Sequence, residues 1–172
     1  MLSLSNVYTV QAGFSEEPRH LYDRTDLQAF ALYHGMSDTR TTWQLDTDDM
    51  GDSVDEREVL SALWTTIAGL HPGAVLAGWK LGGLVLPILV RKSMRHGVPV
   101  PYMLRADLEM RYSTVHTVDL NRIYTQGGGG FMPPEFGLLQ ALDDWGIAVP
   151  DDANRLLALA KAQHIALTRY FA

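Results

Sequence analysis

A short apolar run, Ala74 to Trp79, constrains the fold of this chain more than any other segment. It follows the turn signal His71-Pro72-Gly73 and has a length typical of a β-strand. A strand without polar residues is normally covered on both faces, as the central strands of parallel sheets are. The sequence on each side has helical periodicity, so the run predicts a buried central strand between two helices.

The amino-terminal part of the chain predicts three further strands. Leu2 to Val10 alternates apolar and polar side chains, which is the period of a half-buried strand. Leu27 to His34 and Thr41 to Leu45 are two more candidates, separated by turn signals from Gly35 to Asp38. Consecutive strands joined by short turns favour an antiparallel start to the sheet.

Two helices are expected to flank the central strand. The first opens with Ser53-Val54-Asp55-Glu56, a capping box in which the Ser53 hydroxyl and the Glu56 carboxylate accept from free N–H groups. The second begins near Pro87 and ends at Gly97, because proline suits a first helical turn and glycine a left-handed cap. The buried face of the first helix has apolar residues at helical spacing: Leu60, Leu63, Trp64, Ile67 and Leu70.

The carboxyl-terminal part adds a strand and two helices. Val115 to Leu120 predicts a strand or a strand-to-helix junction. Phe136 to Trp145 predicts a short helix ended by Gly146, and Asp151-Asp152 marks the start of the last helix. Strands first, then strands alternating with helices, indicate one α/β domain over residues 1–172, a mixed sheet flanked by helices. One face of the last helix combines Leu157, Ala160, His164, Leu167 and Phe171.

The composition fits a single cytoplasmic domain. The chain has 172 residues and neither an internal repeat nor a convincing linker. It has no cysteine, which excludes disulfides and thiol catalysis and suits a reducing compartment. No apolar stretch reaches the ~18 residues of a membrane span, and the first residues lack a secretory pattern. We therefore expect a cytoplasmic protein without a membrane partner.

The charge balance argues against a general affinity for nucleic acid. The formal net charge is −6, whereas proteins of that kind neutralise phosphates with lysine and arginine. Arg91, Lys92 and Arg95 form a basic cluster on the second helix, which we interpret as a solvated face. Nucleic-acid binding is therefore expected to be weak.

Familiar metal motifs fail on individual ligands. Asp46, Asp48 and Gly51 match positions of a calcium-binding EF-hand loop, but Met50 and Arg57 stand where two more ligands are needed. We interpret this stretch as a solvated loop that leads into a helix. The histidines have no metal-site spacing: His20, His34, His71, His96, His116 and His164.

The segment from Leu76 to Leu89 resembles the second motif of a nuclease family. In that motif a glycine-containing strand leads to an asparagine and then to Phe-Asp-Leu-Pro at the start of a helix. The family comprises predicted 3′–5′ exonucleases related to the proofreading domain of family B DNA polymerases, within the DEDD superfamily. The resemblance spans nearly the whole chain and implies an RNase H-like fold. Further blocks occur in the family's order: Arg91 to Pro101, His116 to Leu120 and Leu138 to Pro150.

The resemblance also identifies four positions at which the family carries metal-binding carboxylates. Two Mg²⁺ or Mn²⁺ ions held there activate the attacking water and stabilise the leaving oxygen. The corresponding residues are Asn6 and Tyr8, then Val85, then His164, and Lys80 stands at a supporting asparagine position. None of the four is a carboxylate, so we expect no catalytic residue, no metal and no cofactor. Tyr8 and His164 are expected to fill the vacated site and form hydrogen bonds there.

The sequence leaves three functions open. The first is a catalytically inactive exonuclease-like domain that acts as a binding or assembly module, with a protein partner or a second copy of itself. The second is a 3′–5′ exonuclease or nucleic-acid-binding protein whose metal site is rebuilt from His116, Asp119 and His164. The structural interpretation of Asp119 is a cap on the helix that follows it. The third is a small-molecule or nucleotide pocket. Residues expected along a ligand or nucleic-acid groove are Tyr8, Trp79, Lys80, His116, Asp119 and His164.

Overall fold

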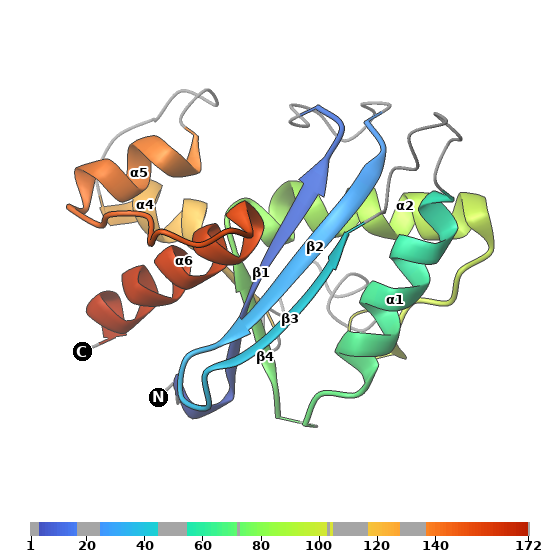
Figure 1. Ribbon diagram of the computed structural model, residues 1–172, viewed down its shortest axis with the longest axis horizontal. Coiled ribbons are helices and arrows are strands. Elements are labelled where there is room, and N and C mark those ends of the chain that lie inside the picture. Colours follow the sequence, from blue (N-terminus) through green and yellow to red (C-terminus); the bar gives the residue numbers. More distant parts are fainter. Residues whose placement is uncertain are drawn as a thin grey trace.

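A five-stranded mixed sheet forms the centre of the described part of the chain (Figure 1). The computed structural model describes residues 4–16, 25–44, 55–71, 73–102, 104, 117–127 and 137–171. The strand order is β3-β2-β1-β4-β5. The strands are β1 (Val7–Phe14), β2 (Leu27–His34), β3 (Thr39–Gln44), β4 (Val75–Gly78) and β5 (Thr117–Asp119).

The strand pairing changes from antiparallel to parallel at β1. This strand pairs antiparallel with β2, with Thr9 opposite Tyr33, and β2 pairs antiparallel with β3. On its other side β1 pairs parallel with β4, with Thr9 opposite Ala77, and β4 pairs parallel with β5. The predicted α/β class is confirmed, because three antiparallel strands followed by parallel strands and helices are consistent with an RNase H-like fold.

Helices cover both faces of this sheet, with α1 and α2 on one side and α4, α5 and α6 on the other (Figure 1). Val10, Phe30, Leu32 and Leu76 pack toward α1 and α2, whereas alternate strand residues pack toward the other helices. The helical elements are η1 (Leu4–Asn6), α1 (Glu56–Ala68), η2 (Leu81–Val85), α2 (Leu86–His96), α4 (Leu120–Gly127), α5 (Leu138–Asp144) and α6 (Arg155–Phe171). Among the described residues, no helix combines the length and apolar character needed to cross a membrane.

Two helices and one strand begin later than the sequence predicted. Leu4–Asn6 is a 3₁₀ turn, so β1 starts at Val7 and continues to Phe14. The helix α6 starts at Arg155, because Asn154 caps it by accepting the Leu157 N–H at 3.1 Å. At α1 the cap is Asp55, whose Oδ1 accepts the Arg57 N–H at 3.0 Å, and not the predicted Ser53, which lies outside the described residues.

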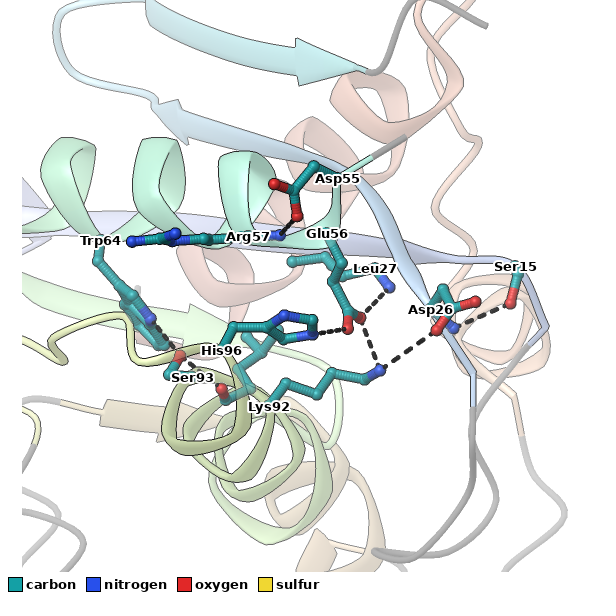
Figure 2. Close-up of polar contacts among 11 residues, drawn as sticks. Ser15, Asp26, Leu27, Asp55, Glu56, Arg57, Trp64, Lys92, Ser93 and His96 are labelled. Carbon is teal, nitrogen blue, oxygen red and sulfur yellow. Dashed lines mark hydrogen bonds and ion pairs between the residues drawn. The ribbon is translucent and has the colours of Figure 1, made fainter. Parts of the chain in front are cut away.

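Glu56 does not complete a capping box because its carboxylate points into the molecule (Figure 2). Its Oε1 accepts from the Leu27 N–H at 2.7 Å and from Lys92 Nζ at 2.6 Å, and its Oε2 accepts from His96 Nε2 at 2.9 Å. Lys92 is only 6% exposed, so interpreting its basic cluster as a solvated face was wrong at this residue. The cluster of Glu56, Lys92 and His96 ties α1 to α2 and to the start of β2.

Other local predictions hold within the described residues. The bounds of β2 are those expected, and β4 is buried at all four positions. Gly97 ends α2 in the left-handed conformation with φ of 64°, and β5 leads directly into α4 as a strand-to-helix junction. The stretch that we interpreted as a solvated loop, residues 46–51, lies outside the described residues.

Candidate functional site

A pocket of about 340 Å³ lies where the carboxyl ends of β1 and β4 meet α5 and α6. Carboxyl ends of parallel strands are a common place for ligand sites in α/β proteins, because side chains from several elements converge there. Its walls are mostly apolar, with one cationic and one amide side chain among them. The lining residues are Gln11, Ala12, Phe14, Trp79, Lys80, Leu84, Val85, Gly137, Leu138, Leu139 and Leu159.

The backbone at the rim of the pocket has an unusual conformation. Lys80 follows β4 and adopts the left-handed region with φ of 52° and ψ of 24°. Its carbonyl oxygen then accepts the N–H groups of both Leu84 and Val85 at 3.0 Å, which closes a single π-helical turn. Left-handed non-glycine residues and π-helical turns are uncommon and are concentrated at functional sites. This is the segment that resembles the second exonuclease motif, and it brings both Lys80 and Val85 to the pocket.

A buried glutamine, Gln163, links β1 to the end of β4 beside the pocket. Gln163 on α6 accepts the backbone N–H of Trp79 at 2.8 Å, and its amide donates to Gln11 Oε1 at 2.7 Å. The chain of hydrogen bonds joins β4, α6 and β1. Gln163 is fully buried. The helical periodicity did not predict its burial, because Gln163 is polar and is not among the residues of the predicted apolar face.

The indole of Trp79 carries an unsatisfied donor. The side chain is 8% exposed, and its Nε1 is buried without a hydrogen-bond partner among the described residues. Its ring lies 5.8 Å from that of Tyr124 in a tilted arrangement.

Asp119 ends β5 close to the same edge of the sheet. Its Oδ2 accepts the Gly83 N–H at 3.2 Å and its Oδ1 the Asn121 N–H at 3.0 Å. Burial raises the pKa of Asp119 above its ordinary value, although backbone N–H groups from Gly83, Asn121 and nearby residues act in the opposite direction. The expected capping role is present, and the carboxylate also holds the glycine turn of η2. Asp119 does not line the pocket.

Tyr8 lies on the other face of the sheet from His164. The Thr9 hydroxyl donates to the α6 carbonyl of Ala160 at 2.8 Å, so Tyr8, its neighbour on the strand, faces α1. There Tyr8 stacks on His34, with ring centroids 4.5 Å apart.

His164 instead packs on the α6 side, edge-on against Tyr33 at 5.5 Å between centroids. Its Nδ1 is buried and has no hydrogen-bond partner in the part of the chain that the structure describes. Burial and then the nearby His34 lower the pKa of His164. His164 is half-buried on the predicted apolar face of the helix, whereas Phe171 at the end of that face is exposed.

The expectation that Asn6, Tyr8, Val85 and His164 share one site is therefore wrong. Val85 lines the pocket, whereas Asn6 precedes β1 at its amino end, and Tyr8 and His164 lie on opposite faces. Gln11 is the polar side chain that β1 contributes to the pocket, and Leu159 is the contribution of α6. Of the expected groove residues, the structure brings Trp79 and Lys80 together there, and His116 lies outside the described residues.

Comparison with known proteins adds no family. No protein-family model matches the chain. No curated protein matches it in sequence either.

The side chains around the pocket do not fit the pair of divalent cations that the exonuclease resemblance implies. Mg²⁺ and Mn²⁺ prefer carboxylate oxygens, and none of the lining residues that the structure describes is an aspartate or a glutamate. The side-chain oxygen of Gln11 already accepts from Gln163, and Lys80 adds a positive charge. Within the described ranges, no group of three or more metal-ligating side chains is close enough to hold a metal ion.

Proposed function

We propose that this chain is a non-catalytic binding module on an RNase H-like scaffold, and that it binds its partner in the pocket at the carboxyl ends of β1 and β4. The observation that carries the proposal is the character of that pocket. Apolar side chains form most of its wall, with Lys80 and Gln11 as the polar groups. Such a lining suits a partner that inserts an apolar group.

The exposed apolar surface at the mouth supports a protein partner or a second copy of the chain. Leu139 lines the pocket and is 53% exposed, so a partner would cover apolar area that is in contact with water. The net charge of −6 disfavours nucleic acid, whose affinity depends largely on phosphate contacts.

The alternative, a nuclease site rebuilt around Asp119 and His164, has less support. Asp119 lies at the carboxyl end of β5, whereas His164 packs beside Gly35, next to the amino end of β1. The two side chains are therefore at opposite ends of the sheet. The raised pKa of Asp119 is the observation that keeps this alternative worth a direct test.

The test is a nuclease assay on the full chain. End-labelled single-stranded DNA and RNA are incubated with the protein in Mg²⁺, Mn²⁺ or Zn²⁺, and the expected result is that neither is shortened. Metal-dependent shortening that is lost in both Asp119→Asn and His164→Phe would overturn the proposal.

A second experiment tests binding at the pocket directly. Because the chain has no cysteine, Leu139→Cys and Met94→Cys each provide a single attachment point for a photocrosslinker. Met94 is 79% exposed on α2, outside the pocket lining. Crosslinking between copies, or to a discrete partner, is expected from position 139 and not from position 94. Equal crosslinking from both positions contradicts a pocket-centred module.

A further inference from the structure

We propose that two copies of this chain pair along β3, so that their sheets join into one continuous sheet across a two-fold axis. The contact is separate from the pocket, because none of the lining residues that the structure describes comes from β3. It is therefore independent of the proposed function, and either proposal can fail without the other.

The outer side of β3 is open to another strand. In the described sheet β3 is the edge strand and pairs only with β2 (Figure 1). Half of the backbone N–H and C=O groups of an edge strand point away from the sheet. Beyond the ladder with β2, no backbone hydrogen bond joins residues 39–44 to another described residue. These outward groups can therefore bind the backbone of a second strand.

The sequence of β3 lacks the features that usually keep an edge strand from pairing. Such edges are blocked by proline, by lysine or by a β-bulge. The segment Thr39-Arg40-Thr41-Thr42-Trp43-Gln44 contains no proline, glycine or lysine. Its pairing with β2 runs over six residue pairs without a register shift. Threonine and tryptophan also favour strands, so β3 is suited to extend the sheet.

Charge favours a second copy of the chain as the partner. The net charge is −6, so two copies repel each other in most orientations. β3 itself contains no carboxylate. Its single cation, Arg40, is paired with Asp38 of the preceding turn at 2.6 Å. The edge is thus close to neutral, and two copies can meet there without strong repulsion.

Symmetry restricts how the two strands align. A two-fold axis perpendicular to the sheet makes the strands antiparallel and keeps each face continuous. Opposite residues then share a face, as Thr41 and Trp43 do, which are half-buried between exposed neighbours. With Thr42 on the axis, Thr41 lies opposite Trp43 of the second copy. Arg40 then lies opposite its Gln44. These pairs are favourable across strands and bring no like charges together.

A single pair of edge strands forms a small interface, so the dimer is weak. Interfaces below about 1,200 Å² are characteristic of transient complexes. We expect sedimentation velocity of the full chain to show monomer at about 1 µM and dimer at about 1 mM. A chain that stays monomeric at about 1 mM overturns the proposal.

Charges placed on the axis test the alignment. Thr42 is exposed, so Thr42→Lys and Thr42→Glu leave the core unchanged. Each alone is expected to weaken dimerisation about threefold or more, because like charges directly opposite repel. An equal mixture of the two should dimerise at least as well as the parent chain. Thr168→Lys, an equal charge change at an exposed position of α6, is the control and should have no effect.

A cysteine on the axis measures proximity directly. Because the chain has no cysteine, Thr42→Cys can form a disulfide only between copies. Opposite Cα atoms in a sheet lie about 4.5–5.5 Å apart, which a disulfide can span. Mild oxidation is expected to link Thr42→Cys much faster than Thr168→Cys, and equal rates overturn the proposal.

Two further outcomes also decide against pairing along β3. One is a mixture of Thr42→Lys and Thr42→Glu that dimerises no better than either variant alone, with both folded by circular dichroism. The other is a dimer that Leu139→Glu abolishes and Thr42→Lys leaves unchanged. That result places the contact at the pocket, which supports the proposed function and overturns this inference.

Discussion

The imidazole ring of His164 lies directly on the backbone of Gly35. A β-carbon built on Gly35 would come within 1.9 Å of His164 Nε2 and 2.2 Å of its Cδ2. The contact joins α6 to the turn between β2 and β3, on the face of the sheet opposite Tyr8. It gives His164 a packing role that the exonuclease resemblance did not imply.

Gly35→Ala is expected to destabilise the protein by about 1–3 kcal/mol, because the new methyl group forces the His164 ring out of its position. In a His164→Ala background the same change should cost much less, since the ring is gone. Chemical denaturation of the four proteins in this double-mutant cycle measures the coupling. Additive free energies of unfolding would show that the two residues are not in steric contact.

His164→Phe is expected to stabilise the protein relative to the parent chain in mild acid and to change little near pH 8. Burial lowers the pKa of His164, so on acidification the unfolded chain takes up a proton on this ring before the folded chain does. The parent therefore loses stability as the pH falls below the ordinary histidine pKa of 6.5, and phenylalanine removes that loss. Melting temperatures of both proteins between pH 5 and pH 8 provide the measurement. A difference in melting temperature between the two proteins that stays the same at every pH would contradict the assignment of this pH dependence to His164.

Glu56→Gln is expected to cost about 3 kcal/mol or more. Glutamine keeps an acceptor for the Leu27 N–H, but it removes the carboxylate that lies 2.6 Å from the buried Lys92 ammonium and leaves Lys92 with the more distant, exposed Asp26 at 3.8 Å. Removing the Lys92 charge as well, in Glu56→Gln with Lys92→Met, should restore part of the loss. Urea denaturation of both variants checks this. A double variant less stable than Glu56→Gln would indicate that the apolar stem of Lys92 matters more than its charge.

The pH dependence of the same cluster follows from Glu56. Burial alone would raise the pKa of Glu56, but the Leu27 N–H, Lys92 and His96 together lower it. The stabilisation is therefore complete above the ordinary value of 4.5 and is lost as the pH falls through the lowered folded-state pKa. Glu56→Gln should flatten this part of the stability profile, as measured by urea midpoints below pH 5.

Gly97→Ala is expected to destabilise the protein by about 1 kcal/mol. Gly97 has φ of 64° with nothing within 4 Å of a built β-carbon, so the cost comes from backbone conformation alone. Gly69→Ala is the matched control at the end of α1, where φ is −79° and the β-carbon would make ordinary contacts. That change should be neutral or stabilising by about 0.5 kcal/mol. Equal melting temperatures for the two variants would contradict the argument.

Signals that depend on neighbours in the sequence predicted the elements well. β2 has its expected bounds, β4 lies within the predicted apolar run, and α2 ends at Gly97. The predicted start of α1 was wrong because the local sequence assigns Glu56 to a capping box, whereas in the structure its carboxylate binds Lys92. That buried partner lies 36 residues further along the chain, as 92 minus 56. A sequence pattern that spans four residues contains no information about an ion pair with a distant residue.

By itself, the sequence determined the type and order of the elements, since periodicity and turn residues act over a few positions. It also determined that Lys80 and Val85 stand in the segment leaving the central strand. Only the tertiary structure decided that these residues meet Gln11 across the pocket, while Tyr8 and His164 face opposite sides of the sheet. The physical reason is that alternation fixes which residues share a face, whereas strand register and long-range helix packing decide what covers that face.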